Sequence, residues 1–154
     1  MIRNAQVADL PALLALAKRL IVKSPYSDVP IDTLTFGSTL GQCIQSAFGF
    51  AVAAVHDEKI TGFMLAAAMP LWFSKHRSAT DFVTYAETPG DGYRMMRRFV
   101  AWAWSIPNVI EITLAQSSGI DIERTAKLYE LIGLHRVGNL YTAVRPVVAV
   151  EEAA

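Results

Sequence analysis

The middle of the chain constrains the fold most, because a strand, a glycine turn and a helix follow one another there without a gap. The β-rich run 82–85 leads into the turn 87–92, and apolar residues then repeat at helical spacing up to Ser105. A strand that ends in such a turn and opens a helix aims unpaired backbone N–H groups at one point, which the helix dipole makes favourable for a phosphate. Gly90 and Gly92 have no side chains, so a diphosphate can approach the backbone closely.

Two carboxylates in this turn set a condition on anion binding. Two unit charges at ~4 Å interact by about 1 kcal/mol in water and about 4 kcal/mol at an effective dielectric of 20, whereas a helix terminus stabilises an anion by roughly 0.3–1 kcal/mol. Glu87 and Asp91 must therefore face away from a bound diphosphate, while Arg94 lies in the first helical turn, within reach of a phosphate oxygen. The alternative is a plain tight turn in which Asp91 caps the helix.

Length and composition predict one folded domain. The chain has 154 residues, of which 53% are hydrophobic and 18% charged, which excludes the disordered class. Fourteen basic residues balance fourteen acidic ones, so neither nucleic acid nor a membrane is expected as a partner. No run reaches ~18 apolar residues, the start lacks the layout of a signal peptide, and the single Cys43 fits a reducing compartment. We expect a cytoplasmic protein with a single domain over residues 1–148 and a frayed tail over 149–154.

The remaining patterns predict an α+β fold in which helices pack on a largely antiparallel sheet. An aromatic loop is expected over 69–78. Helices are expected from Asp9, with Pro11 in the first turn, from Asp32, with Ala47 on its apolar side, and over 93–105 and 122–132. Strands are expected at 2–3, 50–55, 60–68, 82–85 and 109–115, and at 134–137 and 140–148, the last two forming a hairpin around Gly138-Asn139.

The element order and several motifs resemble the GNAT superfamily of acyl-CoA N-acyltransferases. The family's cofactor signature is Gln or Arg, two residues, Gly, one residue, then Gly or Ala; the turn Glu87–Gly92 has this spacing and both glycines, with Glu in the first position. Ala126–Leu134 is similar to the late family segment A-x-x-LYE-x-x-GF, and Gly138–Tyr141 to the glycine-aromatic closure of these proteins. The resemblance covers roughly 2–142 and implies the GNAT fold, a mixed, mostly antiparallel sheet of six to seven strands flanked by about four helices.

A weaker similarity links the chain to GNAT proteins that are common in bacteriophage genomes. It is carried by Ser24-x-Tyr26, by Leu71-Trp72-Phe73-Ser74 and by Trp104 before the fifth strand.

The resemblance implies acetyl-CoA, or another acyl-CoA, as co-substrate and no metal. A backbone N–H beside the central strand would polarise the acyl carbonyl in a gap next to that strand. Tyr129 matches the family tyrosine that protonates the leaving thiolate, which a phenol with a pKa of about 10 can do. The sequence fits equally well a structural role, in which Tyr129 packs as an aromatic residue of the helix. The implied acceptor pocket contains Tyr26, Trp72 and Phe73. The implied cofactor-binding residues are Val83, Thr84 and Tyr85 for the pantetheine arm and Pro89, Gly90, Asp91, Gly92, Tyr93 and Arg94 for the diphosphate.

No general base can be identified from the sequence. Asp28, Asp81, Glu87 and Glu111 remain candidates, and a chain of water molecules would also serve. The three histidines are scattered without metal-ligand spacing.

Two functions follow as expectations. The first is an N-acyltransferase that moves an acetyl group from coenzyme A to a primary amine by direct attack, with an acceptor that the sequence does not identify. The second is an inactive GNAT-fold protein with an interaction or assembly role, for example a phage particle component found in the virion, which the acidic cofactor turn favours. The loop aromatics make a homo-oligomer or larger assembly plausible.

Overall fold

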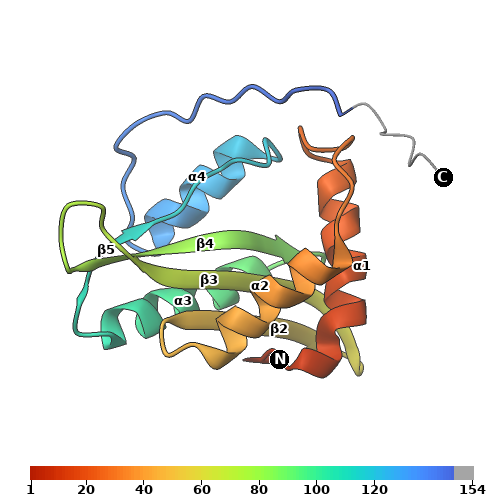
Figure 1. Ribbon diagram of the computed structural model, residues 1–154, viewed down its shortest axis with the longest axis horizontal. Helices are drawn as coiled ribbons and strands as arrows, with labels where there is room; N and C mark the ends of the chain where they lie inside the picture. The colour runs from red at the N-terminus through yellow and green to blue at the C-terminus, as the bar shows by residue number, and fades with distance from the viewer. Residues whose placement is uncertain (148–154) are drawn as a thin grey trace.

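The computed structural model describes residues 1–147 and shows a five-stranded sheet with helices on both faces (Figure 1). The strands lie in the order β1-β2-β3-β4-β5, and all neighbours are antiparallel except β4 and β5, which are parallel. The elements in chain order are β1 (Ile2–Asn4), the 3-10 turn η1 (Val7–Asp9), α1 (Leu10–Val22), α2 (Thr33–Gln45), β2 (Gly49–His56), β3 (Lys59–Pro70), β4 (Arg77–Ala86), α3 (Asp91–Ser105), β5 (Val109–Thr113) and α4 (Ile122–Leu131). The α+β prediction is confirmed.

One face of the sheet is covered by α1 and α2. Leu13 and Leu16 of α1 and Leu40 of α2 are buried in a cluster with Phe63 and Leu65 of β3. The apolar residues of each helix recur at helical spacing, so burying one stripe leaves the polar side in solvent.

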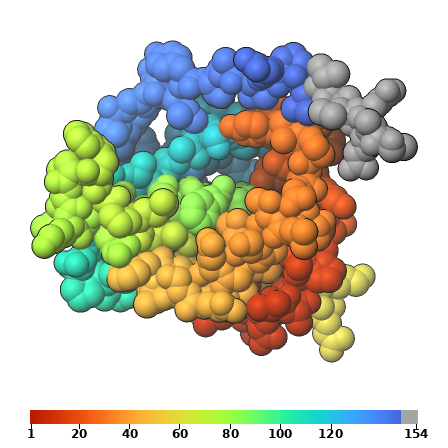
Figure 2. All heavy atoms as spheres, in the orientation of Figure 1, coloured from red at the N-terminus to blue at the C-terminus, as the bar shows by residue number. Residues whose placement is uncertain are grey.

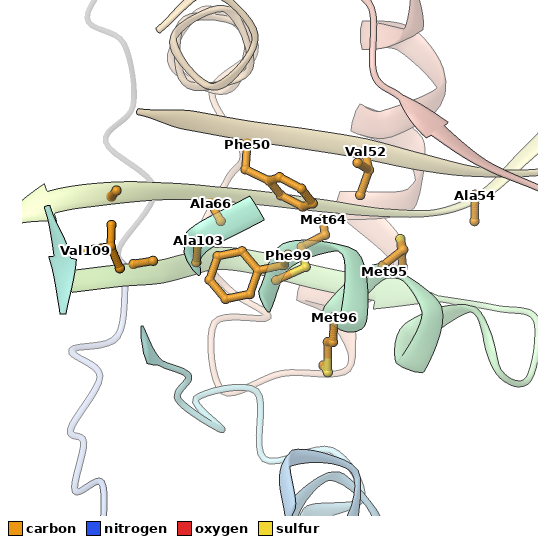
Figure 3. Close-up of a cluster of buried hydrophobic side chains, with 12 residues drawn as sticks. Phe50, Val52, Ala54, Met64, Ala66, Met95, Met96, Phe99, Ala103 and Val109 are labelled. Carbon is orange, nitrogen blue, oxygen red and sulfur yellow. The ribbon is translucent and has the colours of Figure 1, made fainter. Parts of the chain in front are cut away.

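The other face is covered by α3. Figure 3 shows Met95 and Phe99 of α3 turned toward the sheet, close to Met64 and Ala66 of β3. The strand prediction for the alanine-rich run 60–68 is confirmed, and its small side chains at this face leave room for the helix. Helix α4 packs at the margin of this cluster through Leu128, Tyr129 and Ile132, and none of its described residues is fully buried.

The acidic residues that precede α1 and α2 make different contacts. Asp32 caps α2 as expected, accepting from the Thr35 backbone N–H at 2.7 Å. Asp9 precedes α1 but makes no side-chain cap bond. Its carboxylate accepts from Arg3 at 2.7 and 2.8 Å and from the Gln6 N–H at 2.8 Å, so it fastens the N-terminal segment instead.

The predicted C-terminal hairpin is wrong for the described residues. Residues 134–147 form no strand, and Val148 and the tail 149–154 lie outside the described part, so the sheet has five strands rather than six to seven. Arg136 donates to the Gly138 carbonyl and the Asn139 side chain within the turn itself, and Val137 and Tyr141 are strongly exposed, as expected of a segment that pairs with no strand of the sheet. Figure 2 shows this segment in blue crossing above the rest of the chain, with open gaps beneath it.

Several element boundaries also differ from the predictions. Strands β3 and β4 extend into the predicted aromatic loop, which shortens to residues 71–76, and α3 begins at Asp91 rather than Tyr93. Ala47 lies beyond the end of α2 and is exposed. Within residues 1–147, every helix is too short or too polar to cross a bilayer.

The turn between β2 and β3 holds two non-glycine residues at positive φ, Asp57 at 46° and Glu58 at 64°. A two-residue hairpin turn of this kind is favourable for Asp-Gly because glycine adopts positive φ without a steric cost.

Replacing the second residue of this turn should stabilise the protein. We expect Glu58→Gly to raise the free energy of unfolding by about 1 kcal/mol, since the left-handed conformation costs an L-residue roughly 1–2 kcal/mol. Urea unfolding measures the change, and Glu58→Ala is the control that removes the same side chain while keeping the strained conformation. An equal gain in both variants would contradict this explanation.

Candidate active site

Strand β4 is paired with its parallel neighbour β5 over only the first part of its length. Its pairing with β5 runs from Arg77 to Thr80 and stops there. From Asp81 to Ala86, among the residues that the structure describes, β4 is paired only with β3. The fold therefore has the gap beside the central strand that the family resemblance implied.

A bulge lies at the point where the gap begins. Leu65 of β3 is opposite Val83 and Ala66 is opposite Asp81, which leaves Phe82 as an extra residue. Side chains of a regular strand alternate between faces, so residues three apart would lie on opposite faces. The extra residue interrupts this alternation, so Asp81 and Thr84 lie close together. The Thr84 hydroxyl donates to the Asp81 carboxylate at 2.9 Å.

Tyr129 of α4 faces this pair from the other side of the gap. Its hydroxyl donates to the Ala115 carbonyl at 3.5 Å. Burial raises the pKa of Tyr129 far above its ordinary value of 10, and the Asp81 carboxylate raises it further. Burial also raises the pKa of Asp81, although its bond from Thr84 acts in the opposite direction. The sequence alone implies the ordinary phenol pKa of about 10, and partial burial together with the Asp81 carboxylate raises the pKa of Tyr129 above that value.

Helix α3 begins at the glycine turn, where several backbone N–H groups have no hydrogen-bond acceptor among residues 1–147. Gly90 is the N-cap residue and has a φ of 87°, a conformation that only glycine adopts readily. The N–H of Asp91 donates to the Thr88 carbonyl at 3.2 Å, and that of Arg94 to the Gly90 carbonyl at 3.1 Å. Within residues 1–147 no acceptor is found for the N–H groups of Gly90, Gly92 and Tyr93. A Cβ added at Gly92 would meet no atom within 4 Å outside its own helix, so the space beside Gly92 is open, whereas one at Gly90 would lie 3.5 Å from the Arg94 guanidinium.

Both carboxylates of the turn point away from these donors. Asp91 is fully buried, and its Oδ2 lies 2.7 Å from His56 Nε2 at the end of β2. Glu87 accepts from Arg19 of α1 at 2.6 Å. Neither side chain occupies the turn, which meets the condition that the sequence sets for anion binding. Asp91 makes no side-chain cap bond, so the simple-cap alternative is not what the turn shows.

The other residues predicted to bind the cofactor lie before and after this turn. Pro89 precedes Gly90 and is exposed, and Tyr85 lies on the α1 face with Val83. The Arg94 guanidinium is half exposed, with Nη1 3.6 Å from Asp91 Oδ1.

The structure does not bring the predicted acceptor residues together. Tyr26 is in the loop after α1, whereas Trp72 and Phe73 are at the tip of the β3–β4 hairpin, at the opposite end of the molecule in Figure 1. Trp72 is 94% exposed and Phe73 67%, and the two rings contact each other edge to face at 5.3 Å. None of the three lines the hollow beside α1 or the cavity between α2 and the ends of β3 and β4.

Of the four candidate general bases, Asp81 is the one that lies where β4 and β5 separate. Asp28 is exposed in the loop after α1, and Glu87 is paired with Arg19. Glu111 is exposed and accepts from Ser78 and Thr113. Asp81 alone of the four lies near Tyr129 at the bulge.

Sequence reasoning missed the role of Phe82. The signal was present: Phe82 and Val83 are adjacent apolar residues in a strand whose neighbours alternate, and such a pair marks a bulge.

Comparisons with known proteins give the fold a name. No family model matches the sequence, and no curated protein matches it. Solved structures do match, among them a predicted acetyltransferase with acetyl-CoA from Clostridium acetobutylicum, which is 21% identical, with a TM-score of 0.69 over 94% of this chain and 95% of that one. A ribosomal-protein-alanine N-acetyltransferase from Brucella melitensis biovar Abortus is 16% identical, with a TM-score of 0.67 over 94% and 98%.

A third match has a different substrate. An aminoglycoside acetyltransferase from an uncultured soil metagenomic sample, in complex with sisomicin, is 14% identical, with a TM-score of 0.63 over 94% and 96% of the two chains. These similarities show that the chain has the GNAT acetyltransferase fold. At such identities they show the fold alone.

Proposed function

We propose that this protein is an N-acyltransferase that transfers an acetyl group from acetyl-CoA to a primary amine. The observation that carries the proposal is the set of N–H groups at Gly90, Gly92 and Tyr93, which have no acceptor within residues 1–147, at a helix start with open space beside Gly92. Such a helix start is a favourable site for a diphosphate. Because Glu87 and Asp91 are held by Arg19 and His56, neither side chain occupies the turn where the anion would lie.

The unpaired edge of β4 fits the rest of the coenzyme. Val83, Thr84 and Tyr85 follow the bulge where β5 has diverged, so the backbone groups on that side are free to pair with the amides of a pantetheine arm. An extended chain that adds to a strand edge in this way gains main-chain hydrogen bonds.

Asp81 and Tyr129 provide the proton chemistry at the gap. The amine nitrogen forms a bond to the thioester carbon as Asp81, directly or through water, accepts the amine proton, and the carbon–sulfur bond breaks to release the thiolate. With its raised pKa, Asp81 is a stronger base than an ordinary carboxylate. Tyr129 holds its own proton tightly, so it stabilises the thiolate as a hydrogen-bond donor, and the proton that the thiolate finally takes comes from Asp81 or solvent.

Replacing Tyr129 by phenylalanine tests this assignment. We expect Tyr129→Phe to lower kcat by about 10- to 100-fold, because a hydrogen bond to a charged group is worth roughly 1.5–3 kcal/mol. The affinity for acetyl-CoA should change little, since the phenol acts on charge that forms only in the reaction. The assay follows release of the coenzyme thiol from acetyl-CoA with a panel of primary amines.

The result is compared with Tyr141→Phe, which removes a hydroxyl from a strongly exposed ring. Equal turnover in both variants and the unmodified protein would remove Tyr129 from the mechanism. Absence of thiol release from the unmodified protein with every amine, despite acetyl-CoA binding, would favour the inactive assembly protein.

The resemblance to bacteriophage GNAT proteins, the virion role and the cytoplasmic location remain predictions. None of the three structures described above is named as a phage protein.

A further inference from the structure

Asp91 places a buried negative charge at the start of α3, between two glycines whose N–H groups belong to the proposed diphosphate site. Its side chain has no exposed surface, and its chain neighbours are Gly90 and Gly92. Its Oδ1 has no hydrogen-bond partner among residues 1–147, and the ion pair of this atom with Arg94 Nη1 spans 3.6 Å. A buried charge is poorly screened by solvent, so this carboxylate repels an anion at the turn although its side chain points away from it.

His56, the last residue of β2, can cancel this charge without losing its contact with Asp91. Its Nε2 lies 2.7 Å from Asp91 Oδ2. An ionised carboxylate only accepts hydrogen bonds, so Nε2 must carry a proton and donate it, which it can do whether or not Nδ1 is also protonated. The hydrogen bond therefore persists when the ring gains a second proton, while the pair changes from one net negative charge to none. The His56 side chain is 34% exposed, so this proton can come from solvent.

The surroundings of the pair leave His56 as the group that sets this charge. Within residues 1–147, Asp91 forms ion pairs with His56 and Arg94 alone. Of the other charged groups around the pair, the Met1 ammonium, which donates to the Val55 carbonyl at 2.8 Å, also titrates near neutral pH, whereas carboxyl, lysine and arginine side chains ordinarily do not. These other groups are the Met1 ammonium, Asp57, Glu58, Lys59, Glu87 and Arg98.

We propose that His56 is a positioning residue for the coenzyme that acts through Asp91, because protonation of His56 cancels the buried charge and tightens diphosphate binding. The inference rests on the proposed function and adds a proton dependence to the binding of its first substrate. When the charge is cancelled, the Arg94 guanidinium, which lies beside Gly90, faces the anion without a competing carboxylate. By linkage, a bound diphosphate favours protonated His56, so binding takes up protons from solution.

The first experiment compares two variants that change the pair in opposite ways. Acetyl-CoA is titrated calorimetrically at about pH 8 and about pH 6, because histidine changes its charge between these values. His56→Gln keeps a donor for Asp91 but cannot be protonated. We expect it to bind acetyl-CoA as the unmodified protein does at the higher pH and about 10-fold more weakly at the lower pH, the scale of one unit charge acting over ~10 Å at an effective dielectric of 20.

Asp91→Asn removes the charge itself and should show the reverse pattern. Its affinity for acetyl-CoA should be about 10-fold higher than that of the unmodified protein at about pH 8, and about equal at about pH 6. The phosphates of acetyl-CoA also titrate in this range, but they do so for every variant, so each comparison is made at one pH. A purely structural role of the pair predicts weaker binding in both variants at both pH values.

The second experiment counts the protons that accompany binding, and it needs only histidine variants. Heats of binding at about pH 7 are compared in two buffers of different ionisation enthalpy. The unmodified protein should take up more protons than His56→Gln. His76→Gln is the matched control, because His76 is exposed in the β3–β4 hairpin, and it should behave as the unmodified protein.

The outcomes separate the two proposals. Equal pH dependence and equal proton uptake in His56→Gln and His76→Gln would overturn the role of His56 while acetyl-CoA binding stands. If Asp91→Asn does not fold, this comparison of the two histidine variants still decides. Failure of acetyl-CoA to bind the unmodified protein at either pH overturns the proposed function itself.

Discussion

Replacing Gly92 by glutamate is expected to weaken acetyl-CoA binding on the order of 100- to 1000-fold. Gly92 lies in the first turn of α3, its N–H is free, and the space beyond its Cα is empty. Gly92→Glu fills that space and adds a negative charge where the diphosphate must lie, which costs about 4 kcal/mol at ~4 Å and an effective dielectric of 20. Because every 1.4 kcal/mol is tenfold in affinity, the expected loss follows directly.

The fold should tolerate this change. Gly92 is helical without a positive φ, so a side chain there relieves the entropic cost of glycine in a helix. Gly41→Glu is the matched control, because Gly41 is also helical and also has no atom within 4 Å of an added Cβ, but lies in α2. Calorimetric titration should show lost binding for the first variant only. Equal affinities in the two variants would mean that the diphosphate does not lie at α3.

Replacing Asp81 by asparagine is expected to lower kcat/KM by at least about 100-fold, the contribution of a positioned general base. Asparagine keeps the size of the side chain and can still accept from the Thr84 hydroxyl, but it cannot take a proton. In the unmodified protein kcat/KM should fall at low pH as the carboxylate is protonated, at a pH above the ordinary carboxyl pKa of about 3.9, since burial raises the pKa of Asp81. This acidic limb should be absent from the profile of Asp81→Asn.

The same replacement, Asp81→Asn, should leave the free energy of unfolding unchanged or raise it, although it lowers activity. With its pKa raised in the folded state, Asp81 binds a proton more tightly there than in the unfolded chain, so its ionisation destabilises the fold as pH rises through that raised pKa. Asp81→Asn removes this cost at pH 7, and its free energy of unfolding should equal or exceed that of the unmodified protein. The difference should disappear at a pH below about 3.9, where the carboxyl is protonated in both states. A large loss of stability at pH 7 would assign Asp81 a structural role.

The segment around the glycine turn was predictable because its signals are local. The strand residues, the glycines and the helical periodicity of 93–105 each act within a few positions, and together they predict the order strand, turn and helix, with the start of α3 two residues late. The condition on Glu87 and Asp91 also followed from charge alone. Their partners Arg19 and His56 are far away in sequence, and only the folded chain shows them.

Other features depend on pairing that no local pattern encodes. Gly138-Asn139 is a strong turn signal, yet a hairpin needs a neighbouring strand edge, and the described part of that segment has none. The acidic residue before α1 fits a cap equally well, but Arg3 offers it a bidentate ion pair. The raised pKa of Tyr129 arises from its burial where α4 packs on the sheet, and the Asp81 carboxylate adds to it, so it depends on contacts that are distant in sequence.

The most direct test of the central claim is to titrate acetyl-CoA into the ¹⁵N-labelled protein and follow its amides. If the diphosphate is held by the start of α3, binding should be micromolar, and the largest shifts should occur at Gly90, Gly92 and Tyr93. Millimolar acetyl-CoA that leaves these three amides unchanged would contradict the account.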